Sequence, residues 1–208
     1  MIIIDNFIQD KSLLNDIVND QDFFNHRGTY MWWDGWWSDS PVDTLKKRLI
    51  NYIWNENCPL IDADYEIEGF EYWTGRHTPG DGLVEVGFDN VSYHLRHHFD
   101  KDEALWHESG KTTIVCPIIG TVFYPDPQVD DIEGGELIMW DTQEVRVDVP
   151  YEIIRPKFNR LVIFDAFKLH AVYEVTKGVR SAIAINLWTQ RPSGLKTGEL
   201  VDERSYLS

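Results

Sequence analysis

Four of the seven histidines lie within fourteen residues of one another: His94, His97, His98 and His107. Within this cluster His98 and Asp100 form a His-x-Asp pattern. Residues i and i+2 of a β-strand point to the same side, so this imidazole and this carboxylate can converge on one point. Together they make half of a metal site, and a third ligand must come from elsewhere in the chain.

His170 is the best candidate for the third ligand, because it follows directly after a predicted strand over 160–164. Two histidines and one carboxylate on one face of a metal ion are the ligand set of non-haem Fe(II) oxygenases, which leaves coordination positions open. We interpret His94, His97 and His107 as structural residues or as neighbours of the ligands. His97 is adjacent to His98, so on a strand it should face the other way.

Arg180 stands ten residues beyond His170, at the start of an apolar segment. An arginine that points inward is costly unless an anion meets it. A guanidinium group suits the far carboxylate of a dicarboxylate whose other end chelates the metal. The spacing therefore indicates a site for a 2-oxo dicarboxylic acid.

The segment from His170 to Ile183, followed by Trp188, resembles the C-terminal signature of the 2-oxoglutarate/Fe(II)-dependent dioxygenases. Within that superfamily it is most similar to the prolyl 4-hydroxylase-like branch. The upstream His98-x-Asp100 and the Gly-Gly-Glu-Leu run at 134–137 fit the same pattern. The resemblance extends over about residues 93–188.

The resemblance implies a double-stranded β-helix (jelly-roll) core in which His98, Asp100 and His170 bind Fe(II). It implies that Arg180 binds 2-oxoglutarate as co-substrate, with ascorbate as a further candidate cofactor. The implied reaction is hydroxylation of a C–H bond with O2 and release of succinate and CO2. The substrate stays open among a peptidyl proline, another protein side chain, an amino acid and a small molecule, because Leu95 replaces a tyrosine common in prolyl hydroxylases.

Short strands separated by turns dominate the chain after residue 65 and indicate an antiparallel sandwich or barrel. We expect strands over 65–74, 84–88, 91–98, 112–119, 136–140, 144–149, 151–154, 160–164, 169–175 and 181–189. Residues 121–135 are interpreted as an insertion between strands, either a loop that closes over substrate or a solvated acidic loop.

Two helices are predicted before this region. Leucine and isoleucine recur at i, i+4 over 10–19, which suits an amphipathic helix. Ser40 offers an N-cap and Pro41 a first helical residue for a second helix that extends to Trp54. We expect one domain over 1–208, with a helical front (1–60) packed on one sheet, the core (about 65–190) and a C-terminal tail (191–208).

The chain has 35 acidic and 19 basic residues, a formal net charge of −16. This charge argues against general binding to nucleic acid or to an anionic membrane, but it would tolerate or attract a cationic substrate. No segment resembles a membrane span or a signal peptide, so we expect a cytoplasmic enzyme. The partners predicted are O2 and a small-molecule or peptide substrate, and no oligomeric state is predicted.

Two alternatives follow from the same residues. A cupin-like or lectin-like β-barrel would bind a metal or ligand without oxygenase activity, and Arg180 would then form a salt bridge. The tryptophan-rich segment 32–37 is either packing between the helices and the sheet or an aromatic wall over the substrate.

Overall fold

The computed structural model describes residues 1–25, 29–56, 66–81, 84–87, 91–141, 151–195 and 201–202. The strands are β1 (Ile2–Ile4), β2 (Thr29–Trp33), β3 (Gly69–His77), β4 (Glu85–Val86), β5 (Ser92–His98), β6 (Ile119–Tyr124), β7 (Glu133–Gly134), β8 (Leu137–Trp140), β9 (Tyr151–Ile154), β10 (Arg160–Phe164), β11 (His170–Tyr173), β12 (Val175–Lys177), β13 (Arg180–Trp188) and β14 (Val201–Asp202). The helices are α1 (Lys11–Asn19), α2 (Leu45–Asn51) with a π-helical continuation (Tyr52–Glu56), α3 (Glu103–Glu108) and a 3-10 turn (Pro127–Asp131). Among the described residues, no helix is long and apolar enough to cross a membrane.

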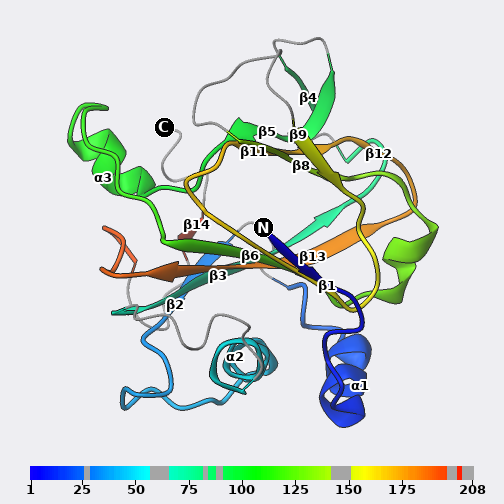
Figure 1. The fold of residues 1–208 in the computed structure, drawn as a ribbon, viewed down its shortest axis with the longest axis horizontal. Coiled ribbons are helices and arrows are strands. Elements are labelled where there is room, and N and C mark those ends of the chain that lie inside the picture. Colours follow the sequence, from blue (N-terminus) through cyan, green and yellow to red (C-terminus); the bar gives the residue numbers. More distant parts are fainter. Residues whose placement is uncertain are drawn as a thin grey trace.

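Two antiparallel sheets face each other, and α1 and α2 cover the outer face of the larger one (Figure 1). The larger sheet has the strand order β1-β10-β6-β13-β3-β2-β14, and the smaller has β4-β5-β11-β8-β9. A separate pair, β7 and β12, lies at one edge. This double-sheet arrangement with N-terminal helices on one sheet is the jelly-roll class predicted from the sequence, and the prediction is confirmed.

The first helix forms where the sequence predicts it. The side chain of Asp10 accepts hydrogen bonds from the backbone N–H groups of Ser12 and Leu13, which caps the N-terminus of α1. Leu13 and Ile17 lie one turn apart, and both are buried in the core between the helices and the larger sheet. The apolar spacing therefore sets which face of α1 packs on the sheet.

The predicted start of the second helix is wrong. The helix begins at Leu45, and its N-cap is Thr44, whose side chain accepts a backbone hydrogen bond from the first turn. Ser40 belongs to the preceding turn: its N–H donates to Ser38 Oγ, and its carbonyl accepts from the Trp33 indole. These contacts hold Ser40 outside the helix despite the proline that follows it.

Alternation along the central strand β13 separates two cores. Ile183, Ile185 and Leu187 face the helices, while Ala182 packs in the core between the two sheets. Positions 180 and 186 share the parity of Ala182, so the side chain of Arg180 also points between the sheets. The polar residues of the site thus lie inside the double-sheet sandwich.

Most predicted strands in the described region correspond to observed ones, but the assignment over 112–135 is wrong. Residues 112–118 form a loop after α3, in which Ile114 is exposed, although β-branched residues favour a strand there. The strand begins at Ile119 and continues to Tyr124, so the first four residues of the predicted insertion, 121–124, are the last four of β6. The predicted strand over 169–175 divides into β11 and β12, and the one over 144–149 lies outside the described residues.

The tryptophan-rich segment mostly serves packing. Trp33 is fully buried and stacks on Phe70 with ring centroids 5.7 Å apart, and Trp36 packs on the same ring. Trp32 points to the other side and packs with Trp188. These contacts support the interpretation of the segment as packing between helices and sheet.

The strands β1 and β2 and the helix α3 were not predicted.

Candidate metal centre

The smaller sheet brings His98 and His170 side by side. His98 is the last residue of β5 and His170 the first of β11, and the two are direct partners in the antiparallel register. Their ring centroids lie 4.2 Å apart. Asp100 follows β5, and its Oδ1 lies 3.9 Å from His98 Nε2 and 3.8 Å from His170 Nε2. The structure therefore brings the three predicted ligands together.

The backbone fixes which nitrogen of each ring faces this point. His98 Nδ1 lies 2.6 Å from the carbonyl oxygen of Arg96, and His170 Nδ1 lies 2.9 Å from that of Lys168. A carbonyl oxygen only accepts, so each Nδ1 carries the proton and each Nε2 presents a lone pair toward Asp100. Two lone pairs and a carboxylate oxygen face one another, an arrangement that a cation would stabilise.

The ligand separations fit a single ion. Two atoms that each lie about 2.1 Å from one metal ion are at most about 4.2 Å apart, and the two nitrogen–oxygen distances are 3.9 and 3.8 Å. Two imidazoles and one carboxylate suit Fe(II) with open positions for further ligands. Phe164 packs edge-on against His170, with ring centroids 5.3 Å apart, while 35% of the His98 side chain is exposed. The centre is therefore closed on the His170 side and accessible on the His98 side.

A second group of convergent side chains, His77, Asp81 and His94, has a different hydrogen-bond pattern. His94 Nε2 lies 3.1 Å from Asp81 Oδ1, but the Nδ1 of the same ring accepts the backbone N–H of Val175 at 2.9 Å. In the neutral ring the proton therefore sits on Nε2 and donates to Asp81. This cluster is explained as a hydrogen-bonded link between β5, β12 and the turn after β3.

Arg180 is buried between the sheets without a carboxylate. Its exposed fraction is 3%; Nε donates to the carbonyl oxygen of Gly135 at 2.9 Å, and a terminal nitrogen donates to the Tyr124 hydroxyl at 3.4 Å. Within the described part of the chain, no acidic side chain forms an ion pair with it. A buried guanidinium is costly without an anion, and its remaining N–H groups suit a carboxylate.

The pairing of β13 with β3 sets two polar pairs far apart on one ladder. Arg180 pairs with His77 at one end, and Asn186 pairs with Glu71 two residues before the other end. Six residues of strand separate the two ends, roughly 20 Å. The residues of the same parity between them on β13 are alanines, at 182 and 184, and Ala182 packs in the core between the sheets.

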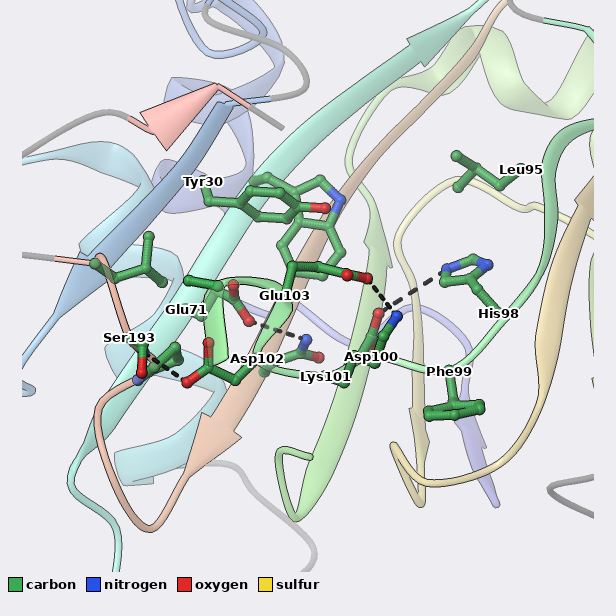
Figure 2. A pocket seen from close by; sticks show the side chains of 15 residues that line it. Tyr30, Glu71, Leu95, His98, Phe99, Asp100, Lys101, Asp102, Glu103 and Ser193 are labelled. Atoms are coloured by element: carbon green, nitrogen blue, oxygen red, sulfur yellow. Dashed lines mark hydrogen bonds and ion pairs between the residues drawn. The ribbon is translucent and has the colours of Figure 1, made fainter. Parts of the chain in front are cut away.

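A pocket of about 150 Å³ opens beside the metal centre at the Glu71 end (Figure 2). It is lined from the sheets and from the segments that follow β5 and β13, by Tyr30, Glu71, Trp73, Leu95, His98, Phe99, Asp100, Lys101, Asp102, Glu103, Ala104, Asn186, Pro192, Ser193 and Leu195. His98 and Asp100 belong to this lining, so the pocket is continuous with the candidate ligands.

Glu71 is the most perturbed acid of this pocket. Burial, followed by the charge of Asp100, raises the pKa of its carboxyl group to about 8. Trp188 Nε1 and Asn186 Nδ2 both donate to its Oε2, at 3.0 and 3.4 Å, which opposes part of that shift. Glu71 was not among the predicted site residues, although an acid inside the apolar run 70–73 was a signal.

The other histidines of the 94–107 cluster, His97 and His107, do not join the candidate centre. His97 faces the other way, as predicted, and its ring packs 4.5 Å from Trp140 and 4.8 Å from Tyr93. His107 is exposed in the last turn of α3. Of the four clustered histidines, only His98 therefore belongs to the candidate centre, where it meets His170.

The sequence matches the model of the 2OG-Fe(II) oxygenase superfamily over residues 86–190, half of the chain. The chain belongs to this superfamily. The match includes both candidate ligand segments and Arg180. Members of the superfamily use Fe(II) and 2-oxoglutarate, so the oxygenase class, its metal and its co-substrate are those expected from the sequence. A comparison with curated proteins finds no match.

Solved structures show the same fold at low sequence identity. A prolyl-4-hydroxylase from Pseudomonas putida is 14% identical, with a TM-score of 0.55 over 91% of this chain and 92% of that one. The viral collagen prolyl hydroxylase of Paramecium bursaria Chlorella virus-1 is 17% identical, with a TM-score of 0.48 over 89% of this chain and 87% of that one. The fold of the oxygenase is thus similar to that of the Pseudomonas enzyme.

Proposed function

We propose that this oxygenase hydroxylates a C–H bond of its substrate, with His98, Asp100 and His170 holding Fe(II) and Arg180 holding 2-oxoglutarate. The single observation that carries the proposal is the convergence of two imidazole lone pairs and a carboxylate oxygen on one point. A hydrogen-bonded structural cluster would place a proton between at least one pair of these atoms, as His94 and Asp81 do.

The surroundings of Arg180 support the second half of the proposal. A buried guanidinium that donates to a carbonyl and a phenol keeps N–H groups for a carboxylate. A cupin-like or lectin-like barrel without oxygenase activity would be expected to pair Arg180 with an acid, and among the described residues no such pair occurs. The bound dicarboxylate would supply the missing counter-charge.

The proposed reaction balances three reactants against three products. Substrate C–H, O2 and 2-oxoglutarate give substrate C–OH, succinate and CO2, so one oxygen atom enters the substrate and the other enters succinate. Iron supplies the redox chemistry when bound. The protein's residues hold it by Nε2 of two rings and by Asp100, orient the co-substrate through Arg180, and leave the His98 side open for the substrate.

The test is oxidation of 2-oxoglutarate by purified protein with Fe(II) and ascorbate in air. We expect succinate in excess of a no-enzyme control, and a His170→Ala variant should lose it. Mass spectrometry of proline peptides, other peptides, amino acids and small metabolites should identify a product heavier by one oxygen atom. A wild-type protein that binds Fe(II) but releases no succinate with any of these would contradict the proposal.

A further inference from the structure

The carboxylate of Glu71 lacks a cationic partner within the described part of the chain. Glu71 lies on β3 with its side chain pointing between the sheets, and only 8% of the residue is exposed. Both of its hydrogen bonds, from Trp188 and Asn186, reach the same oxygen, Oε2. The other oxygen, Oε1, receives no hydrogen bond from the described residues, and Glu71 lines the pocket beside the candidate metal centre (Figure 2). A buried carboxyl group with one unused oxygen calls for a donor from a ligand.

The charges that line this pocket favour a cation. Besides Glu71 and the candidate ligand Asp100, the lining contains Asp102 and Glu103, and its one basic side chain, Lys101, forms an ion pair with Glu103. Asp102 is buried and accepts only backbone N–H groups, from α3 and from residue 193. With Lys101 paired and Asp100 assigned to the metal, Asp102 keeps the pocket negative, and a cation bound beside Glu71 would favour the ionised form of its carboxyl group.

The pocket walls suit a chain with an apolar stem. Tyr30 of β2 and Trp73 of β3 pack edge to face with ring centroids 4.9 Å apart. Aromatic faces attract ammonium and guanidinium groups. Leu95 and Phe99 lie near His98 at the other end of the pocket (Figure 2), where they would contact methylene groups.

We propose that this pocket binds the cationic end of the substrate, an ammonium or guanidinium group on an aliphatic stem, with Glu71 as its carboxylate partner. The proposal rests on the proposed function and specifies its substrate class. The volume of about 150 Å³ is comparable to an engineered cavity that holds benzene, so one side chain fits and a peptide backbone would remain outside. The cation lies at the Glu71 end and the stem passes the open side of the iron.

Binding can be measured without turnover on protein loaded with Mn(II) and 2-oxoglutarate in the absence of oxygen. Isothermal titration calorimetry with L-lysine and L-arginine should give dissociation constants about tenfold or more below those of L-norleucine and L-citrulline, which match their shapes without the charge. Nα-acetyl-L-lysine N-methylamide distinguishes the source of the cation: tighter binding than L-lysine indicates a protein side chain, and weaker binding a free amino acid.

Glu71→Gln tests the assigned partner, because it keeps the acceptor for Trp188 and Asn186 but cannot form the carboxylate that a bound cation would stabilise. We expect it to weaken binding of L-lysine about tenfold or more and to leave L-norleucine binding unchanged. Glu108→Gln, which replaces an exposed acid of α3 outside the pocket, also removes one acidic group and should leave the binding of both ligands unaffected. Circular dichroism and Mn(II) binding verify that each variant is folded. If Glu71→Gln does not fold, the comparison of charged and neutral ligands on wild-type protein still tests whether the pocket prefers a cation.

The two proposals fail in different ways. Protein that releases succinate from 2-oxoglutarate but binds L-norleucine as tightly as L-lysine, and L-citrulline as tightly as L-arginine, overturns the cation pocket alone. Equal losses of L-lysine binding in Glu71→Gln and Glu108→Gln also overturn it, because the effect would then be one of overall charge. Absence of succinate release contradicts the proposed oxygenase reaction, whereas selective binding of the two cations would still support the pocket.

Discussion

His98 and His170 are directly paired on β5 and β11, and each ring is oriented by the carbonyl group two residues before it in the chain. The same contact, from ring Nδ1 to a backbone carbonyl oxygen, thus occurs on two adjacent strands. It directs both Nε2 lone pairs to Asp100 before any metal binds. Preorganisation of this kind reduces the cost of assembling the ligands, because the backbone has already fixed the ring orientations.

Metal binding should depend on Asp100 and not on the similar acid of the second cluster. Asp100→Asn removes the charged ligand and should lower the affinity for Mn(II) by about 100-fold or more. Asp81→Asn is the matched control, since Asp81 also contacts a histidine ring but as acceptor of its N–H. Calorimetric titration with Mn(II) provides the measurement. Equal losses in both variants would contradict the assignment of the centre.

The proton positions of the rings are directly observable. In metal-free protein above pH 7, His98 and His170 should carry their proton on Nδ1, because each Nδ1 donates to a carbonyl. His94 should carry its proton on Nε2, because its Nδ1 accepts the N–H of Val175. Long-range nitrogen–proton NMR correlations distinguish the two tautomers. Finding the Nε2–H form in His98 or His170 would argue against a preorganised site.

Arg180 should determine the affinity for 2-oxoglutarate more than the affinity for metal. Arg180→Lys keeps the charge but loses the forked geometry, and we expect the KM for 2-oxoglutarate to rise about tenfold; Arg180→Gln should raise it further. Mn(II) binding should persist in both variants, because no ligand changes. Steady-state kinetics of succinate release and Mn(II) titration separate the two effects. An unchanged KM in Arg180→Gln would place the co-substrate elsewhere.

The candidate ligands could be selected from the sequence because their residue types and spacing are those of a metal site. A His-x-Asp pattern and a distant histidine and arginine have few common structural explanations when they occur at this spacing. The jelly roll was predictable for a similar reason, since short alternating segments without helices between them exclude parallel units.

The pocket was not predictable, because tertiary pairing creates it. Glu71 and Asn186 meet only through the register of β3 with β13, and Tyr30 meets Trp73 only through β2, a strand that was not predicted. Local signals also gave wrong boundaries where tertiary contacts override them, as at Ser40, which is bound into the preceding turn. Residue type alone contains no information about these partners.

The glycine pair beside Arg180 should be sensitive to substitution. Gly134 has a φ of +78°, and a Cβ there would lie 1.9 Å from the carbonyl oxygen of Glu174, so Gly134→Ala requires the backbone to move. We expect a loss of about 2–4 kcal/mol in the free energy of unfolding, and a raised KM for 2-oxoglutarate because the neighbouring Gly135 accepts from Arg180.

Gly110 provides the control for that substitution. Its φ is +65°, but a Cβ would meet no atom within 4 Å, so Gly110→Ala adds only backbone strain, about 1 kcal/mol. Urea denaturation measures the loss in free energy of unfolding of each variant. If the two variants lose the same free energy of unfolding, the close approach between Gly134 and Glu174 is not the cause of the loss in Gly134→Ala.

The raised pKa of Glu71 makes the stability of the protein depend on pH in a definite direction. The pKa is about 8 in the folded protein against an ordinary value of 4.5, so between these values the folded state retains a proton that the unfolded chain has released. Stability from this group is therefore fully present below about pH 4.5 and is lost as the pH rises toward 8.

Glu71→Gln cannot titrate, so relative to wild type it should gain about 2–4 kcal/mol in free energy of unfolding between pH 5 and pH 8. Urea denaturation of both proteins with EDTA at the two pH values measures this gain, and Glu108→Gln, which replaces an exposed acid, should show none. A constant difference between Glu71→Gln and wild type would mean that Glu71 is ionised in the folded protein throughout this range.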